Sequence, residues 1–118
     1  MADLTEWFHE LASKGRDSLV REASAANREK LRVHITTSLP GSLPPTDLDS
    51  ERFADYVLEM RANEKAWNQA TMAALIEADD LFNQGLTIDA RSALRNFAAT
   101  CPWSAFREAA LNQAANYR

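Results

Sequence analysis

Residues 38–49, SLPGSLPPTDLD, constrain the fold more than any other stretch, because no α-helix can run through them. The segment has three prolines and a glycine in twelve residues, and proline removes a backbone donor and clashes with the preceding helical turn. Pro44 and Pro45 also keep the residue before each of them extended. The segment is therefore predicted to be a linker between an N-terminal helical part, residues 1–37, and a second helical part, residues 50–118.

Outside this linker, apolar residues recur at the three- and four-residue spacing of α-helices. The first apolar face consists of Leu4, Trp7, Phe8 and Leu11. Asp3 can cap this helix, and Gly15 is expected to stop or kink it before the helical spacing resumes at Leu19. No segment alternates apolar and polar residues as a half-buried strand does. We therefore predict a single all-α domain, residues 1–118, with an N-terminal pair of helices.

The part after the linker is predicted to begin with a helix capped by Thr46 or Asp49, since both side chains can accept a bond from the first helical turn. Helical spacing then continues as far as Gly85, which is long for one globular helix. Residues 61–66, RANEKA, are polar enough to contain a turn. Two helices are therefore expected before Gly85.

Two further helices are expected in the C-terminal part of the chain. One begins at Thr87 or Asp89 and ends before Pro102, and the last runs from about Ser104 to the C-terminus. The whole chain is thus expected to contain about five helices.

Charge and composition narrow the classes of function. A net charge of -4 and a pI near 5.1 argue against general affinity for nucleic acids or anionic membranes. Cys101 is the only cysteine, so no disulfide can form within the chain, which fits a reducing cytoplasm. No apolar stretch approaches the roughly 20 residues that span a bilayer. The acidic N-terminus, MADLTEWFHEL, differs from a signal peptide. We expect a cytoplasmic protein that does not enter membranes.

Six residues between about residue 74 and residue 118 have a spacing that indicates a helical hairpin: Ala78, Leu81, Gly85, Ala90, Leu94 and Pro102. This spacing resembles that of a tetratricopeptide repeat, a hairpin of two antiparallel helices about 34 residues long. Small residues at Ala78 and Ala90 allow the two helices to cross closely, and Gly85 follows the first helix where a positive φ is expected. Phe97 departs from the family, which usually has a small residue there.

The resemblance implies a helical hairpin followed by a closing helix. Because one repeat cannot bury its own apolar face, the upstream helices are expected to complete its packing. Alanine and leucine at helical spacing also occur in ordinary helical hairpins, so a true repeat and a hairpin within a bundle remain alternatives.

Candidate catalytic groups are sparse. Glu6 and His9 have the Glu-x-x-His spacing of di-iron bundles, but such sites need a second pair and two more carboxylates. Glu77, Asp79 and Asp80 share no helix face with a histidine or nucleophile, and a solvated surface is the simplest interpretation of this cluster. No enzyme activity, metal or cofactor is therefore predicted.

Two charged stripes are the candidate partner-binding features. The acidic stripe comprises Glu51, Asp55 and Glu59, which are spaced four residues apart, and the basic stripe comprises Arg21, Arg28 and Arg32. The stripes either face each other across antiparallel helices or one of them binds a partner. Trp103 flanks a turn, where it could stand exposed in a binding groove.

These observations favour a non-enzymatic protein-interaction module, such as an adaptor, a chaperone or an inhibitor that binds another polypeptide. One alternative is a small nucleic-acid-binding regulator that uses residues 14–34, where basic residues outnumber acids but no aromatic side chains interleave. The other is a metal-dependent helical-bundle enzyme that uses Glu6 and His9. The apolar N-terminal face must be buried on its own domain or on a second copy, so a homodimer is possible.

Overall fold

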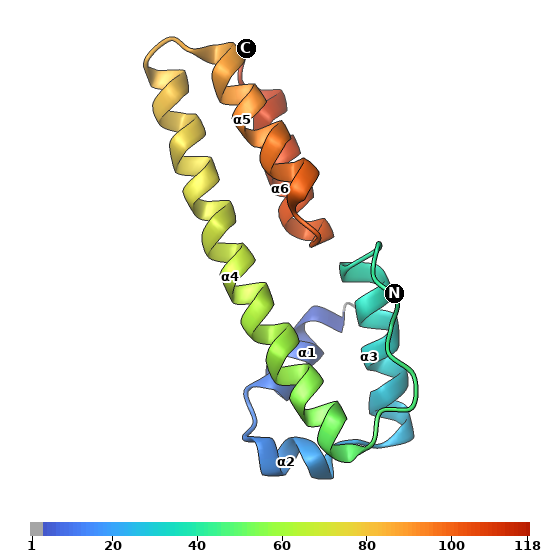
Figure 1. Ribbon diagram of the computed structural model, residues 1–118. Coiled ribbons are helices and arrows are strands. Elements are labelled where there is room, and N and C mark those ends of the chain that lie inside the picture. The colour runs from blue at the N-terminus through green and yellow to red at the C-terminus, as the bar shows by residue number, and fades with distance from the viewer. Residues whose placement is uncertain (1–3) are drawn as a thin grey trace. The chain divides into compact units, whose positions relative to one another are not determined.

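The computed structural model describes residues 4–118, and these residues form six helices and no strand (Figure 1). The helices are α1 (Leu4–Ala12), α2 (Arg16–Arg21), α3 (Ala25–Ser38), α4 (Ser50–Asn83), α5 (Thr87–Thr100) and α6 (Ser104–Asn116). The prediction of an all-α chain is confirmed. The chain divides into two compact units, Met1–Glu64 and Lys65–Arg118. The expected cap Asp3 lies outside the described residues.

The N-terminal segment contains three helices, so the predicted pair is wrong. The break at Gly15 is confirmed, since this residue precedes the first residue of α2. A second break separates α2 from α3, where the Ser24 hydroxyl accepts a hydrogen bond of 3.0 Å from the backbone N–H of Asn27. This is an N-cap, and it satisfies a donor that the first helical turn leaves open. A serine three residues before Asn27 was the local signal for this break.

The N-terminal unit buries its own apolar faces. Its buried hydrophobic residues are Phe8, Leu11, Leu19, Leu31, Ile35, Leu39, Phe53, Ala54, Val57 and Met60. The rings of Phe8 and His34 lie 4.7 Å apart between centroids, which joins α1 to α3. The chain itself buries Phe8 and Leu11 and leaves Leu4 and Trp7 half-buried, so it covers most of the N-terminal face without a second copy. Homodimer formation stays a prediction.

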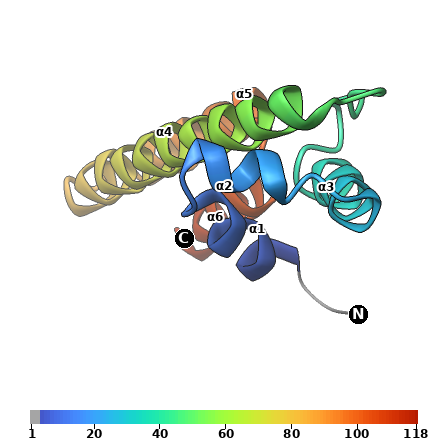
Figure 2. The same cartoon turned by 90° about the horizontal axis from the view of Figure 1, so that it is seen from below.

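The linker between α3 and α4 determines the direction of α4. α3 and the first half of α4 run in the same general direction, and the linker returns alongside α3 (Figures 1 and 2). A 14-residue helix is about 21 Å long, whereas eleven residues of extended chain reach about 36 Å, so the return is easily spanned. Asp49 then caps α4, because its carboxylate accepts a bond of 2.8 Å from the Arg52 backbone N–H.

α4 is one continuous helix of 34 residues, and the predicted turn in residues 61–66 is wrong. No proline or glycine lies between Ser50 and Asn83, so nothing local interrupts the backbone hydrogen bonds. Arg61, Glu64 and Lys65 in this segment are good helix formers. Arg61 and Glu64 also form an ion pair across one helical turn. Polarity in this segment therefore does not mark a loop, and one of its charged residues, Glu64, is buried.

In the C-terminal unit, α5 and α6 pack with the second half of α4 (Figure 1). The shared core contains Ala78, Ala90, Leu94, Ala98, Ala110, Ala114 and Tyr117. Ala78 and Ala90 are both fully buried, as expected where helices approach closely. The predicted starts of α5 at Thr87 and of α6 at Ser104 are confirmed.

The turn between α4 and α5 is a Schellman motif centred on Gly85. Gly85 has a φ of +83°, which confirms the expected left-handed conformation. Its N–H donates to the Phe82 carbonyl at 2.9 Å, and the Leu86 N–H donates to the Leu81 carbonyl at 2.9 Å. These are the two bonds that define this helix C-terminus. They satisfy carbonyls that the end of α4 would otherwise leave open.

Candidate partner-binding surfaces

The acidic stripe lies on the first half of α4, and all three of its side chains are exposed. Asp55 accepts a hydrogen bond of 2.8 Å from Nε of Arg16, the first residue of α2. This hydrogen bond lowers the pKa of Asp55 and raises the pKa of Arg16. No ion pair among residues 4–118 includes Glu51 or Glu59. The stripe is thus partly neutralised, by a residue outside the predicted basic stripe.

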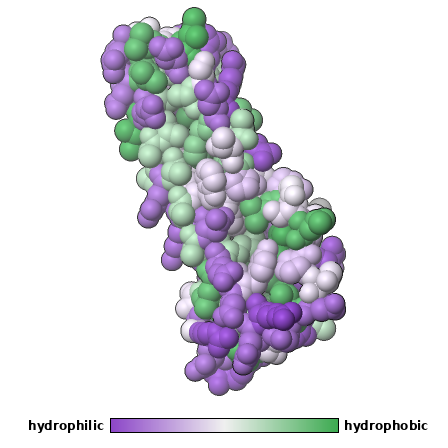
Figure 3. Space-filling view, in the orientation of Figure 1, coloured by the Kyte–Doolittle hydropathy of each residue, from purple (hydrophilic) through white to green (hydrophobic). Residues whose placement is uncertain are grey.

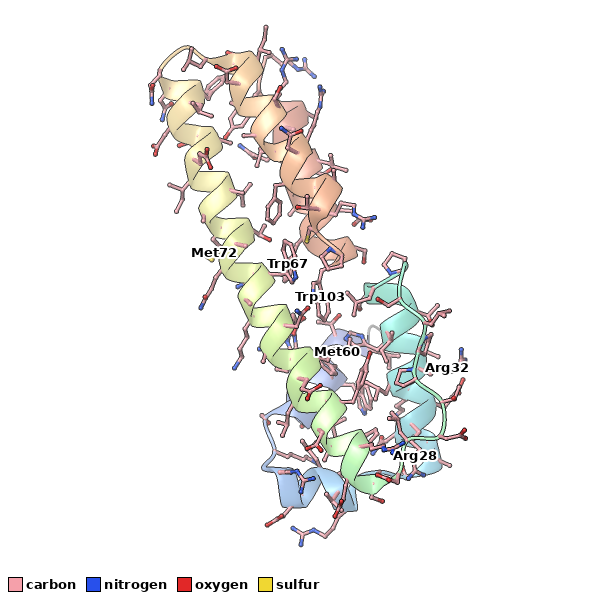
Figure 4. The ribbon with its side chains drawn as sticks, in the orientation of Figure 1. Arg28, Arg32, Met60, Trp67, Met72 and Trp103 are labelled. Atoms are coloured by element: carbon pink, nitrogen blue, oxygen red, sulfur yellow. The ribbon has the colours of Figure 1, made fainter. Side chains whose placement is uncertain are left out.

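Two arginines of the basic stripe contact side chains of their own helices, and the third is half-buried. Arg32 donates to Glu29 at 2.9 Å within α3, and Arg21 lies 3.4 Å from the hydroxyl of Ser18 within α2. Arg28 is half-buried, and its Nε has no hydrogen-bond partner among residues 4–118 (Figure 4). The proposal that the two stripes face each other across antiparallel helices is wrong, since α3 and α4 run in the same general direction.

Trp103 is buried, with 2% of its surface exposed, so the expected exposed position in a groove is wrong. It occupies the position before α6, where its carbonyl accepts the first helical bond from the Arg107 N–H at 3.0 Å. Its ring lies 6.2 Å from that of Phe106. The Arg107 side chain bonds the carbonyl of Cys101 at 2.9 Å. The turn between α5 and α6 is therefore closed by packing, which buries the indole.

His9 forms its polar contacts with α4 and not with Glu6. Its Nε2 lies 2.9 and 3.0 Å from the two carboxylate oxygens of Glu64, which is 7% exposed. Arg61 pairs with the same carboxylate. This contact joins α1 to α4, and the sequence pattern missed it because 55 residues separate the two side chains. Residues 4–118 contain no group of three histidine, cysteine or acidic side chains placed to hold a metal.

The C-terminal unit exposes two large apolar side chains on one side of α4. Met72 is 56% exposed and Ile76, one turn later, is 63% exposed. Met72 lies on the opposite side of α4 from Trp67, which faces α5 (Figure 4). Further hydrophobic surface lies at the α4–α5 turn (Figure 3), where Leu86 and Ile88 are exposed.

An open groove of about 320 Å³ lies beside Ile76. It is lined by Leu75, Ile76, Asp79 and Asp80 of α4, by Gln113 of α6 and by Tyr117. The sequence pattern identified Asp79 and Asp80 but interpreted them only as solvated surface. The sequence did contain a signal for this exposed surface: Met72 and Ile76 are large apolar residues one turn apart, and they lie outside the helix face that contains Ala78.

Comparison with known proteins found no matching family model, no matching curated protein and no matching solved structure. None of the helices in residues 4–118 is both long and apolar enough to span a bilayer.

Proposed function

We propose that this protein is a non-enzymatic interaction module, an adaptor, chaperone or inhibitor that binds another polypeptide through its C-terminal unit. The observation that carries the proposal is the exposed pair Met72 and Ile76 beside an open groove. A single exposed apolar residue is ordinary, but two large ones in adjacent turns next to a concave surface are typical of interaction sites. Methionine adapts to partners of different shape, which suits such a surface.

We further propose that the hairpin formed by the end of α4 and by α5 is a repeat-like frame for this surface. Three features support this interpretation: the left-handed Gly85, the buried Ala78 and Ala90 in one core, and Pro102 before α6. A rigid helical frame holds an interaction surface in one geometry, which reduces the entropy lost on binding.

Photocrosslinking tests this proposal. A photoreactive phenylalanine analogue at position 76, in the full chain expressed in its native cell, is expected to form an adduct with another polypeptide. The same analogue at Ile88 is the control, because that side chain is 72% exposed but lies outside the groove. Absence of any polypeptide adduct at position 76, or equal adducts at both positions, would contradict the proposal.

A further inference from the structure

The groove on the C-terminal unit combines apolar surface with two exposed carboxylates. Ile76 contributes exposed apolar surface, and Asp79 and Asp80 lie one turn further along α4. No ion pair among residues 4–118 includes either aspartate. Within the described residues 4–118, the side chain of Asp79 makes one polar contact, a 3.4 Å hydrogen bond from the side chain of Asn83. These charges are therefore available to a binding partner.

The position of the two aspartates is unfavourable for α4 itself. They lie in the last five residues of the helix, where the macrodipole carries partial negative charge and cations are preferred. Residues 66–83 contain three acids and no lysine or arginine, so α4 supplies no compensating cation there. Asp79 and Asp80 thus weaken the folded state of the free protein, and they lie beside the exposed side chain of Ile76. A role in binding explains their position better than a role in stability does.

We propose that this groove binds a basic amphipathic helix of the partner polypeptide. An apolar side chain of that helix packs on Ile76, and its lysines or arginines pair with Asp79 and Asp80. These cations also interact favourably with the partial negative charge at the C-terminal end of α4. Met72 and Ile76 are four residues apart, which matches the spacing of apolar anchors on a helix laid in a groove. The inference rests on the proposed function and names the chemical class of its partner.

A second copy of the chain fits this groove less well. An isologous dimer uses the same patch on both subunits, so it would bring the aspartates of two copies into one interface without any basic residue of the groove to offset them. Like charges brought together in a partly desolvated interface repel each other. Charge complementarity therefore favours a basic partner over self-association through this surface.

Selection from a phage-displayed library of random 16-residue peptides tests the proposal on the full chain. We expect enrichment of peptides with net positive charge and apolar residues at helical spacing. For a selected peptide, Ile76→Ser is expected to weaken affinity about tenfold or more through lost apolar contact. The double variant Asp79→Asn/Asp80→Asn is expected to weaken affinity about fivefold, and less so at high salt.

The aspartate variant has a second readout that a purely structural role would not produce. Replacing the two acids is expected to raise the urea midpoint of the free protein, because it removes charge repelled by the helix dipole, while peptide affinity falls. The matched control is Glu10→Gln/Asp17→Asn, which removes two exposed acids from α1 and α2, outside the groove and outside the acidic stripe. This control is expected to leave affinity unchanged.

Several outcomes would overturn the inference. They are enrichment of neutral or acidic peptides, an equal loss of affinity in the Glu10→Gln/Asp17→Asn control, or a dimer in sedimentation that Ile76→Ser abolishes. If crosslinking at position 76 captures a polypeptide whose bound segment is not basic, the interaction function stands and only the partner class is wrong. If no polypeptide is captured, the proposed function fails as well.

Discussion

Replacement of Gly85 by alanine should destabilise the protein, and the turn geometry sets the size of the effect. Gly85 is the second residue after the end of α4 and has a φ of +83°. A Cβ built at this position meets no atom within 4 Å, so steric clash with the rest of the fold makes no contribution. The cost comes from the backbone alone, because an L-residue with a Cβ is disfavoured in the left-handed region.

The magnitude follows from two opposing effects. Holding alanine in the left-handed conformation costs about 1–2 kcal/mol. Alanine also reduces the conformational freedom of the unfolded chain, which returns about 0.4–1 kcal/mol. The expected net loss in the free energy of unfolding is about 1 kcal/mol. Gly85→Asn should lose less, since asparagine tolerates this conformation, and Gly85→Val should lose more because of β-branching.

Urea denaturation followed by circular dichroism measures the difference. The matched control is Gly41→Ala, since Gly41 lies in the linker, does not have a positive φ, and has nothing within 4 Å of a built Cβ. This control is expected to be neutral or slightly stabilising. An unchanged or higher midpoint for Gly85→Ala would refute the reasoning, because it would place Gly85 in an ordinary helical conformation.

Three further predictions concern stability. The hydrogen bond from Arg16 lowers the pKa of Asp55, so Asp55→Asn should reduce the free energy of unfolding in a pH-dependent way. The loss should be complete above the ordinary carboxyl pKa and should disappear as the pH falls through the lowered pKa. A loss that does not change with pH in urea melts would contradict this. Ala78→Leu should cost about 1–3 kcal/mol through overpacking, whereas the exposed Ala73→Leu should be nearly neutral; equal melting temperatures would count against the shared core. Arg107→Ala should lower the melting temperature by removing the hydrogen bond to the end of α5, and no shift would show that water replaces this bond.

Several features of the fold were predictable because they depend on a few neighbouring residues. Proline and glycine exclude helix from the linker, Gly15 separates α1 from α2, and Asp49 caps α4 through a residue three positions away. The left-handed turn at Gly85 follows in the same way from the absence of a side chain. Local sterics and hydrogen bonding act over one helical turn, and the sequence contains everything that they require.

Other features depend on residues that are distant in the sequence, and only the tertiary structure decided them. Asp55 pairs with Arg16 rather than with the basic stripe because the linker returns and α4 runs in the same general direction as α3. Glu64 finds His9 across 55 residues, and the indole of Trp103 is buried by packing around its turn. Helical periodicity shows which faces of a helix are apolar. Which neighbour covers each face, and which faces stay open, depends on the relative directions of helices, and these long-range arrangements leave no local pattern.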